Sequence, residues 1–149
     1  MTLGVAGLVQ IATPFVWLGA VLGISFLETP LKFRAPGMTI ALGLGIGRLV
    51  FRALNVAEFV LAAALTAAVF AGDHGLGADP TTLLLIALWA LLGIQVAALR
   101  PRLNARTDVI LAGGSPPRSH LHLAYIALEA TKVVLLPVLG VLLVLEAAA

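Results

Sequence analysis

The sequence predicts an all-α integral membrane protein, built as a bundle of four helices. Of its 149 residues, 61% are hydrophobic and only 11% are charged, whereas a typical soluble domain carries about 25% charged residues. This number of polar side chains is too small to cover the surface of a water-soluble domain. Lipid must therefore cover part of the surface. The chain also contains four apolar stretches of about the 20 residues that a membrane-spanning helix needs. Its length suits a single transmembrane domain, residues 1–149.

The four expected spans are residues 3–27, 53–71, 81–99 and 122–145. Pro14 and Pro137 fall inside the first and fourth spans, where neighbouring helices can satisfy the backbone groups that a proline frees. The first ten residues lack the basic region of a cleavable signal peptide. We therefore expect the first apolar stretch to remain as a span.

The segment before the second span is unusually long. Residues 37–72 contain no proline, and as one helix they would extend about 54 Å, well beyond the roughly 30 Å of a bilayer core. We therefore expect an additional interfacial or re-entrant helical segment over residues 37–52. Gly43, Gly45 and Gly47 would permit a bend or a close helix contact there.

The positions of the charges predict an orientation. Four of the nine basic residues lie in the stretch 100–118, whereas the connection between the second and third spans carries Asp73 and Asp79 but no Lys or Arg. The positive-inside rule places the Arg-rich loop 100–118 in the cytoplasm and both termini outside. We expect the protein in a bacterial plasma membrane. The chain has no cysteine, which excludes a disulfide framework and thiolate chemistry.

Polar residues also occur inside the expected spans. In the fourth span, at 100° per residue, an arc of about 80° holds four of them: His122, Tyr125, Glu129 and Lys132. A second arc of about 120°, running from the segment before the second span into that span, holds four more: Arg48, Arg52, Asn55 and Glu58. Gln95 and Glu28 lie at the same expected depth.

A charge at mid-membrane costs roughly 3 kcal/mol, so such residues usually face a partner or water. We expect Arg48, Arg52 and Lys132 to balance Glu28, Glu58 and Glu129 in one network. The first functional hypothesis makes the two arcs a site that binds or translocates a small polar or ionic solute, or a lipid headgroup. Its eight residues are Arg48, Arg52, Asn55, Glu58, His122, Tyr125, Glu129 and Lys132.

Two alternatives remain open. In one, the charges are purely structural and the protein is an accessory or scaffold subunit of a larger membrane complex. In the other, the protein binds haem or is another membrane enzyme, with His120 and His122 as ligands. No Ser/His/Asp arrangement or phosphate loop supports an enzyme, and no cofactor is expected from the residues. The expected partners are membrane lipids and a homo-oligomer or larger complex, with "GAVLG" at 19–23 as a candidate helix contact or dimer face. Nucleic acid is not expected.

Two stretches resemble the transmembrane protein 205-like family of small four-helix membrane proteins. After the first span, that family often shows a proline, an aromatic near an arginine, and a Gly-containing run that ends in Phe. The matching residues here are Pro30, Phe33, Arg34, Gly43, Gly47 and Phe51. At the start of the fourth span the family's histidine corresponds to His122, while Tyr125 and Glu129 replace its small hydroxyl residue and its Asn. The resemblance implies a four-helix membrane protein of poorly defined activity.

Overall fold

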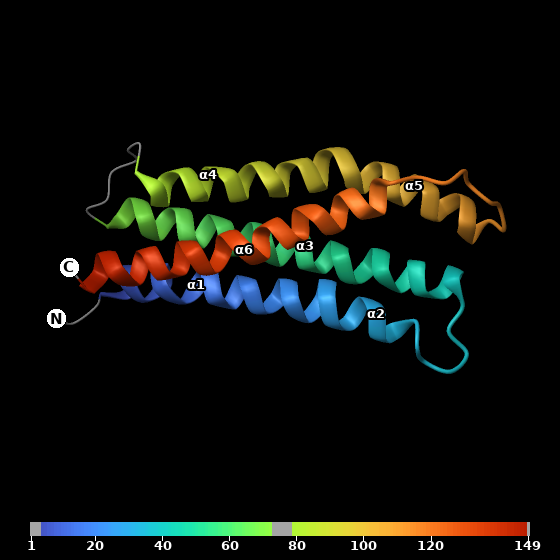
Figure 1. The fold of residues 1–149 in the computed structure, drawn as a ribbon, viewed down its shortest axis with the longest axis horizontal. Coiled ribbons are helices and arrows are strands. Elements are labelled where there is room, and N and C mark those ends of the chain that lie inside the picture. The colour runs from blue at the N-terminus through green and yellow to red at the C-terminus, as the bar shows by residue number, and fades with distance from the viewer. Residues whose placement is uncertain (1–3, 73–78, 149) are drawn as a thin grey trace.

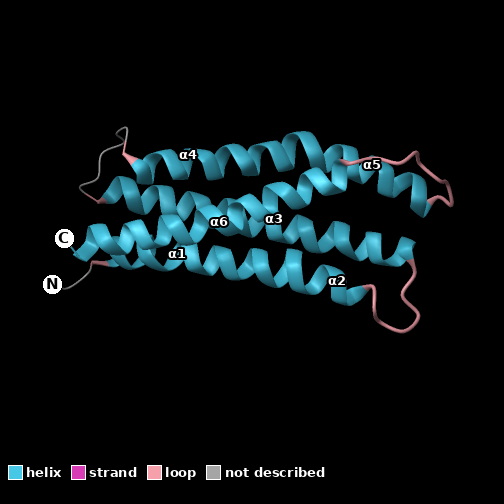
Figure 2. Ribbon diagram, in the orientation of Figure 1, coloured by secondary structure: helices cyan, strands magenta, loops and turns pink. Residues whose placement is uncertain are grey.

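The computed structural model describes residues 4–72 and 79–148. Every element of the described chain is a helix or a connection (Figure 2). The helices form four long rods that lie side by side, with both termini at the same end (Figure 1). Asp73, in the acidic connection discussed above, lies outside the described residues.

The first rod runs without a break from Val5 to Lys32 through α1 (Val5–Val21), the π-helical η1 (Leu22–Glu28) and α2 (Thr29–Lys32). At the end of η1, the Thr29 N–H donates to the carbonyl of Ile24, five residues earlier. Pro30 follows directly. A proline has no N–H and its ring crowds the carbonyl four residues before it, so the turn in front of Pro30 widens to a π-helical one.

The second rod is one continuous helix, α3 (Ile40–Ala71), in which the Thr39 side chain caps the first turn by accepting from the Leu42 N–H at 3.2 Å. The structure therefore contains no separate interfacial or re-entrant segment over residues 37–52. The 32 residues of α3 extend about 48 Å. Because α2 and α5 continue beside it at the same end (Figure 1), the extra length becomes an extension of the bundle and does not need to fold back.

The third rod consists of α4 (Pro80–Gly93), the π-helical η2 (Ile94–Leu99) and α5 (Arg100–Leu111). Here too the π-helical turns lie just before a proline, Pro101, and the Arg100 N–H donates to the Gln95 carbonyl five residues earlier. The stretch 100–118, expected as a loop, is thus helical up to Leu111. Gly113, at φ +82°, follows the helix end in the left-handed conformation that glycine adopts most readily.

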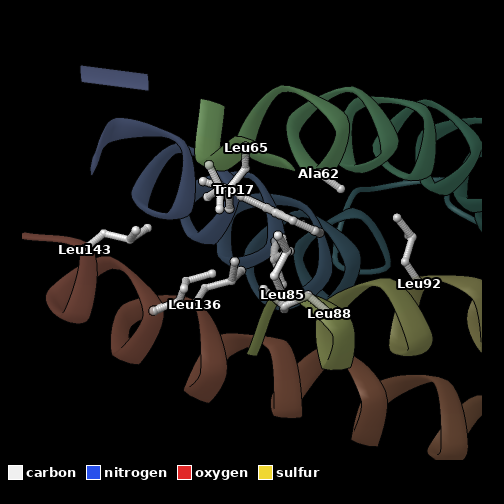
Figure 3. Close-up of a cluster of buried hydrophobic side chains, with 11 residues drawn as sticks. Trp17, Ala62, Leu65, Leu85, Leu88, Leu92, Leu136 and Leu143 are labelled. Carbon is white, nitrogen blue, oxygen red and sulfur yellow. The ribbon is translucent and has the colours of Figure 1, made fainter. Parts of the chain in front are cut away.

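The fourth rod is α6 (Leu121–Ala148). The principal packing partners of α1 are α3 and α6, and those of α4 are also α3 and α6. The four rods therefore form a ring in which α3 and α6 stand diagonally. A cluster of buried apolar side chains from all four rods fills the half of this bundle that holds the termini (Figure 3): Trp17, Val21, Ala62, Leu65, Val69, Leu85, Leu88, Leu92, Leu136, Leu139 and Leu143.

All four rods are long and apolar enough to cross a membrane. Large apolar side chains point outward along each of them, for example Leu8, Val60, Ile86 and Val134. The all-α fold is therefore confirmed, and each expected span falls within a helical rod that is long and apolar enough to cross a membrane and is longer than that span. α5 carries Arg100, Arg102, Arg106 and Asp108 in twelve residues, so this end of the bundle is far more polar than the apolar half.

The small residues of "GAVLG" do not form the helix contact that was one of their expected roles. A Cβ built on Gly19 or Gly23 would meet nothing within 4 Å. The close approach of α1 and α6 occurs elsewhere, because a Cβ on Gly140 would lie 2.7 Å from the ring of Phe15. Gly140 is thus the glycine that lets α6 pack against α1.

Gly140→Leu is expected to lower the free energy of unfolding by about 1–3 kcal/mol, because the added side chain overpacks the contact with Phe15. Gly93→Leu is the matched control, since a Cβ there meets nothing within 4 Å. Both variants would be measured by detergent-titrated unfolding, with the fluorescence of the two tryptophans as the signal. Equal stability of the two variants would contradict the close contact.

Candidate functional site

Three charged side chains form a buried charge cluster in the middle of the bundle: Glu58, Glu129 and Lys132. Lys132, on α6, reaches across the bundle to donate from Nζ to Glu58 Oε1 on α3, and it also donates to Glu129 Oε1 at 3.1 Å. The three side chains are between 0% and 1% exposed. Because α3 and α6 stand diagonally, the cluster joins two rods that otherwise pack little against each other.

Glu58 is surrounded by hydrogen-bond donors. Besides Lys132, its Oε1 accepts from Trp17 Nε1 at 2.9 Å, and its Oε2 accepts from Asn55 Nδ2 at 3.0 Å. Both oxygens are therefore occupied by donors from α1, α3 and α6. Such an arrangement suits an ionised carboxylate held rigidly in place.

Glu129 is held by side chains from both π-helical segments. Gln95, in η2, donates to its Oε1 at 2.8 Å, and Ser25, in η1, donates to its Oε2 at 3.2 Å. Widened turns of this kind are frequent at functional sites. The two prolines that widen these turns thus contribute indirectly to the position of the donors around Glu129.

A second set of polar contacts connects the cluster to α5. Asn55 Nδ2 donates to the Tyr125 hydroxyl at 3.3 Å, and Arg100 Nη1 donates to Asn55 Oδ1 at 3.1 Å. The ring of Phe51 packs edge-on against Tyr125, with centroids 5.4 Å apart. Asn55 therefore connects the buried Glu58 to Arg100, at the start of α5, through hydrogen bonds.

A pocket of about 620 Å³ lies beside this cluster, toward the α5 end of the bundle. Glu129 and Tyr125 form part of its wall, so the pocket borders the buried charges directly. All four rods contribute to the wall: Ser25, Phe26, Thr29, Pro30, Lys32, Phe33, Gly43, Leu44, Gly47, Arg48, Phe51, Arg100, Leu103, Asn104, Arg106, Thr107, Ile110, His122, Tyr125, Ile126 and Glu129.

Four cations line the pocket. Lys32 pairs with Glu28 at 3.3 Å, and Arg48 Nη2 pairs with Asp108 at 2.7 Å and also donates to the Asn104 carbonyl. The other two cations, Arg100 and Arg106, have no carboxylate partner among the residues that the structure describes. Among the described residues, Glu129 is the only carboxylate in the wall, and it is already bound to Lys132.

Gly43 and Gly47 allow α2 and α3 to approach at the pocket. A Cβ on Gly43 would overlap the Phe33 ring, and one on Gly47 would lie 3.1 Å from Lys32 Nζ. The glycines that suggested a bend in the sequence therefore serve a close helix contact, the other role considered for them. They make room for two side chains of the pocket wall.

The structure brings together most, but not all, of the eight expected site residues. Asn55, Glu58, Tyr125, Glu129 and Lys132 form one connected polar network. Arg48 and His122 line the pocket. Arg52, in contrast, is exposed and outside the pocket, and it has no hydrogen-bond or ion-pair partner in the described chain.

The expected balance of three positive and three negative charges in one network is not formed. Glu28 pairs with Lys32, Arg48 pairs with Asp108, and Arg52 faces outward. On helical geometry Arg52 lies about 120° from Glu58. Because Glu58 faces the bundle centre, a side chain so far around α3 turns to the outside.

Three residues of the polar network were not predicted as site residues from the sequence: Ser25, Trp17 and Arg100. Ser25 is a polar residue inside an apolar span, which was the available signal. Trp17 packs in the apolar core while its indole N–H donates to Glu58. Arg100 was interpreted as one of the four arginines of the stretch 100–118 that predict the orientation.

The two candidate haem ligands do not share a site. His122 lines the pocket, whereas His120 is exposed and outside it. Among residues 4–72 and 79–148, no group of three or more His, Asp or Glu side chains is placed to hold a metal ion.

Comparisons with protein-family models, curated proteins and solved structures find no match for this chain. The resemblance to the transmembrane protein 205-like family therefore rests on the quoted residues alone.

Proposed function

We propose that this protein binds a small polar or ionic ligand, a solute or a lipid headgroup, in the pocket beside the buried charge cluster. The observation that carries the proposal is a pocket of about 620 Å³ that all four rods line and that has Glu129 in its wall. Ligand pockets of a few hundred Å³ that combine apolar walls with a few polar groups are typical of small-molecule sites. Here Lys132, itself bound to Glu58, holds Glu129 in place. Arg48, Arg100 and His122 supply polar groups of the wall.

Binding is better supported than conduction through a single chain. Beyond the buried charge cluster, the apolar side chains around Trp17, Leu65, Leu88 and Leu139 fill the bundle centre. An ion cannot cross such a region without its hydration shell except at high cost. Translocation would therefore need a rearrangement of the rods or a path between copies of the protein.

For the orientation, we propose that the α5 end of the bundle faces the cytoplasm and that both termini face outward. The connections at the α5 end carry Arg34 and Arg118, and the helix that projects there carries Arg102 and Arg106. This excess of arginine follows the positive-inside rule. The pocket would then open toward the cytoplasmic side.

One observation favours the alternative of an accessory or scaffold subunit. Within the buried charge cluster each group is satisfied by protein donors or acceptors, so these three residues alone would explain a purely structural role. The pocket separates the two hypotheses, because a scaffold has no need of a cavity that retains a ligand.

Filling the pocket is expected to abolish ligand binding. Thr107 lines the pocket, and its hydroxyl donates only to the carbonyl of Leu103 in its own helix. Thr107→Trp therefore fills the space without removing a charge or a contact between rods. Native mass spectrometry of gently extracted protein would report the retained ligand, which we expect in the wild type and not in this variant.

Thr131→Trp is the matched control. Thr131 makes the same kind of bond to its own helix, is exposed, and lies outside the pocket, so this variant should retain the ligand. Retention in both variants would overturn the proposed site. A wild type that retains nothing, and is stabilised by none of a panel of cations, anions and lipids, would favour the scaffold alternative.

A further inference from the structure

From the charges in the pocket wall we infer that the ligand is an anionic amphiphile, with a phosphate headgroup at the arginines and an apolar chain along the phenylalanines. This inference rests on the proposed function, since it names the ligand class of the same pocket. It depends on two separate features of the wall: guanidinium groups that lack an anionic partner, and an apolar surface that continues to the outside of the bundle.

The unmatched guanidinium groups indicate an anion. Arg106 lines the pocket and has no hydrogen-bond or ion-pair partner in the described part of the chain. Arg100 is held only by neutral acceptors, the Asn55 side chain at 3.1 Å and the Arg48 carbonyl at 3.2 Å. With Lys32 and Arg48 beside them, an anion in the pocket would meet cations from α2, α3 and α5.

A buried donor without an acceptor is a second indication of an anionic ligand. Arg48 Nε is buried and makes no hydrogen bond, although the Nη2 of the same side chain is bound to Asn104 and Asp108. An unsatisfied buried donor costs about 1–3 kcal/mol. Since Arg48 lines the pocket, a ligand oxygen would supply the missing acceptor.

Phosphate suits these donors better than a single hydroxyl or amide would. Its oxygens accept several bonds at once, and guanidinium groups bind it in a two-pronged manner. A bound phosphate would place negative charge between Arg100 and Arg106, the two cations that lack a carboxylate.

The rest of the wall requires more than free phosphate. Most of the pocket surface is apolar, with Phe26, Phe33, Phe51 and Ile126 among its residues. Phe26, Phe33 and Ile126 are also 39–43% exposed on the outside of the bundle. Each of these three side chains thus borders both the pocket and the outer surface, which would face lipid in a membrane, and an acyl chain fits such apolar surroundings.

The test compares two arginines of α5. Arg106 lines the pocket without a partner, whereas Arg102 is exposed, lies outside the pocket, and donates to the Ala98 carbonyl of its own rod. Arg106→Gln and Arg102→Gln remove the same charge from the same helix. The probes are phosphatidic acid, phosphatidylcholine with the same chains, and inorganic phosphate, each titrated against detergent-solubilised protein and followed by native mass spectrometry.

We expect the wild type to bind phosphatidic acid at least tenfold more tightly than phosphatidylcholine or inorganic phosphate. Arg106→Gln should weaken that binding by about tenfold, the effect of losing one charge-assisted bond, and Arg102→Gln should leave it unchanged. If the two variants weakened binding equally, the lipid would be attracted by the general surface charge of α5 and not by the pocket, which would overturn the inference. If phosphatidylcholine bound as tightly as phosphatidic acid, the ligand would not need an anionic headgroup. If inorganic phosphate bound as tightly, the ligand would not need an apolar chain.

Failure of this inference is distinguishable from failure of the proposed function. If a cation or a neutral solute is retained and is lost in Thr107→Trp, the pocket is a binding site and only the ligand class is wrong. If phosphatidic acid remains bound in both Thr107→Trp and Arg106→Gln, the lipid lies elsewhere on the surface, and neither proposal stands.

Discussion

Lys132→Met is expected to destabilise the folded protein by about 3–5 kcal/mol, because it leaves Glu58 and Glu129 as buried carboxylates without a cation. The loss is large because Glu58 is fully buried and lies outside the pocket, so water cannot replace the ammonium group beside it. Detergent-titrated unfolding, followed by tryptophan fluorescence, would measure the change in the free energy of unfolding.

Lys32→Met is the control for the loss of a lysine from an ion pair. Lys32 pairs with Glu28 within one helical turn, and Glu28 is 32% exposed, so this variant should cost less than about 1 kcal/mol. Adding Glu58→Gln and Glu129→Gln to Lys132→Met removes the unpaired charges and should recover more than half of the loss. If Lys32→Met and Lys132→Met had the same effect, Lys132 would not occupy the centre of an ion-pair cluster.

Glu58→Gln is expected to cost about 3 kcal/mol, whereas Glu129→Gln should cost less than about 1 kcal/mol. Trp17 and Lys132 donate to one oxygen of Glu58 and Asn55 donates to the other, so in either orientation a glutamine amide group would face a donor. A buried donor that loses its acceptor costs about 1–3 kcal/mol, and more when it is charged.

We expect position 129 to tolerate a glutamine because the two oxygens of Glu129 have different hydrogen-bond partners. A glutamine can keep its oxygen toward Gln95 and Lys132 and turn its NH₂ toward Ser25, whose hydroxyl can accept as well as donate. Unfolding measurements on the two single variants test this asymmetry directly. A larger loss for Glu129→Gln than for Glu58→Gln would show that the donors are arranged differently.

The levels of the polar residues along the bundle could be predicted, but several of their partners could not. Arg48, Arg52, Asn55 and Glu58 share one arc of α3, and that arc does not say which edge faces the centre. Packing of α3 against α1 and α4 turned Glu58 inward and Arg52 outward. Likewise Asp108, in a stretch expected to be a loop, became the partner of Arg48 only because α5 continues as a helix beside α3.

The donors around Glu129 could not be predicted from the geometry of regular helices. That geometry places residues at 100° per position, and a π-helical turn shifts the residues that follow it. Ser25 and Gln95 lie in two such segments, each next to a proline. The prolines are visible in the sequence, but whether a proline ends a helix, kinks it or widens a turn depends on the rods that pack against it.

The sequence by itself predicted four helices apolar enough to cross a membrane, and the end of the bundle at which polar residues gather. These are properties of local composition, because a stretch of apolar residues must be covered by lipid or protein wherever it lies. Only the tertiary structure decided that residues 40–71 form one helix, that Lys132 crosses the bundle to Glu58, and that a pocket opens beside Glu129. Those features depend on the rotation and offset of neighbouring rods, which are set by contacts between residues far apart in the chain.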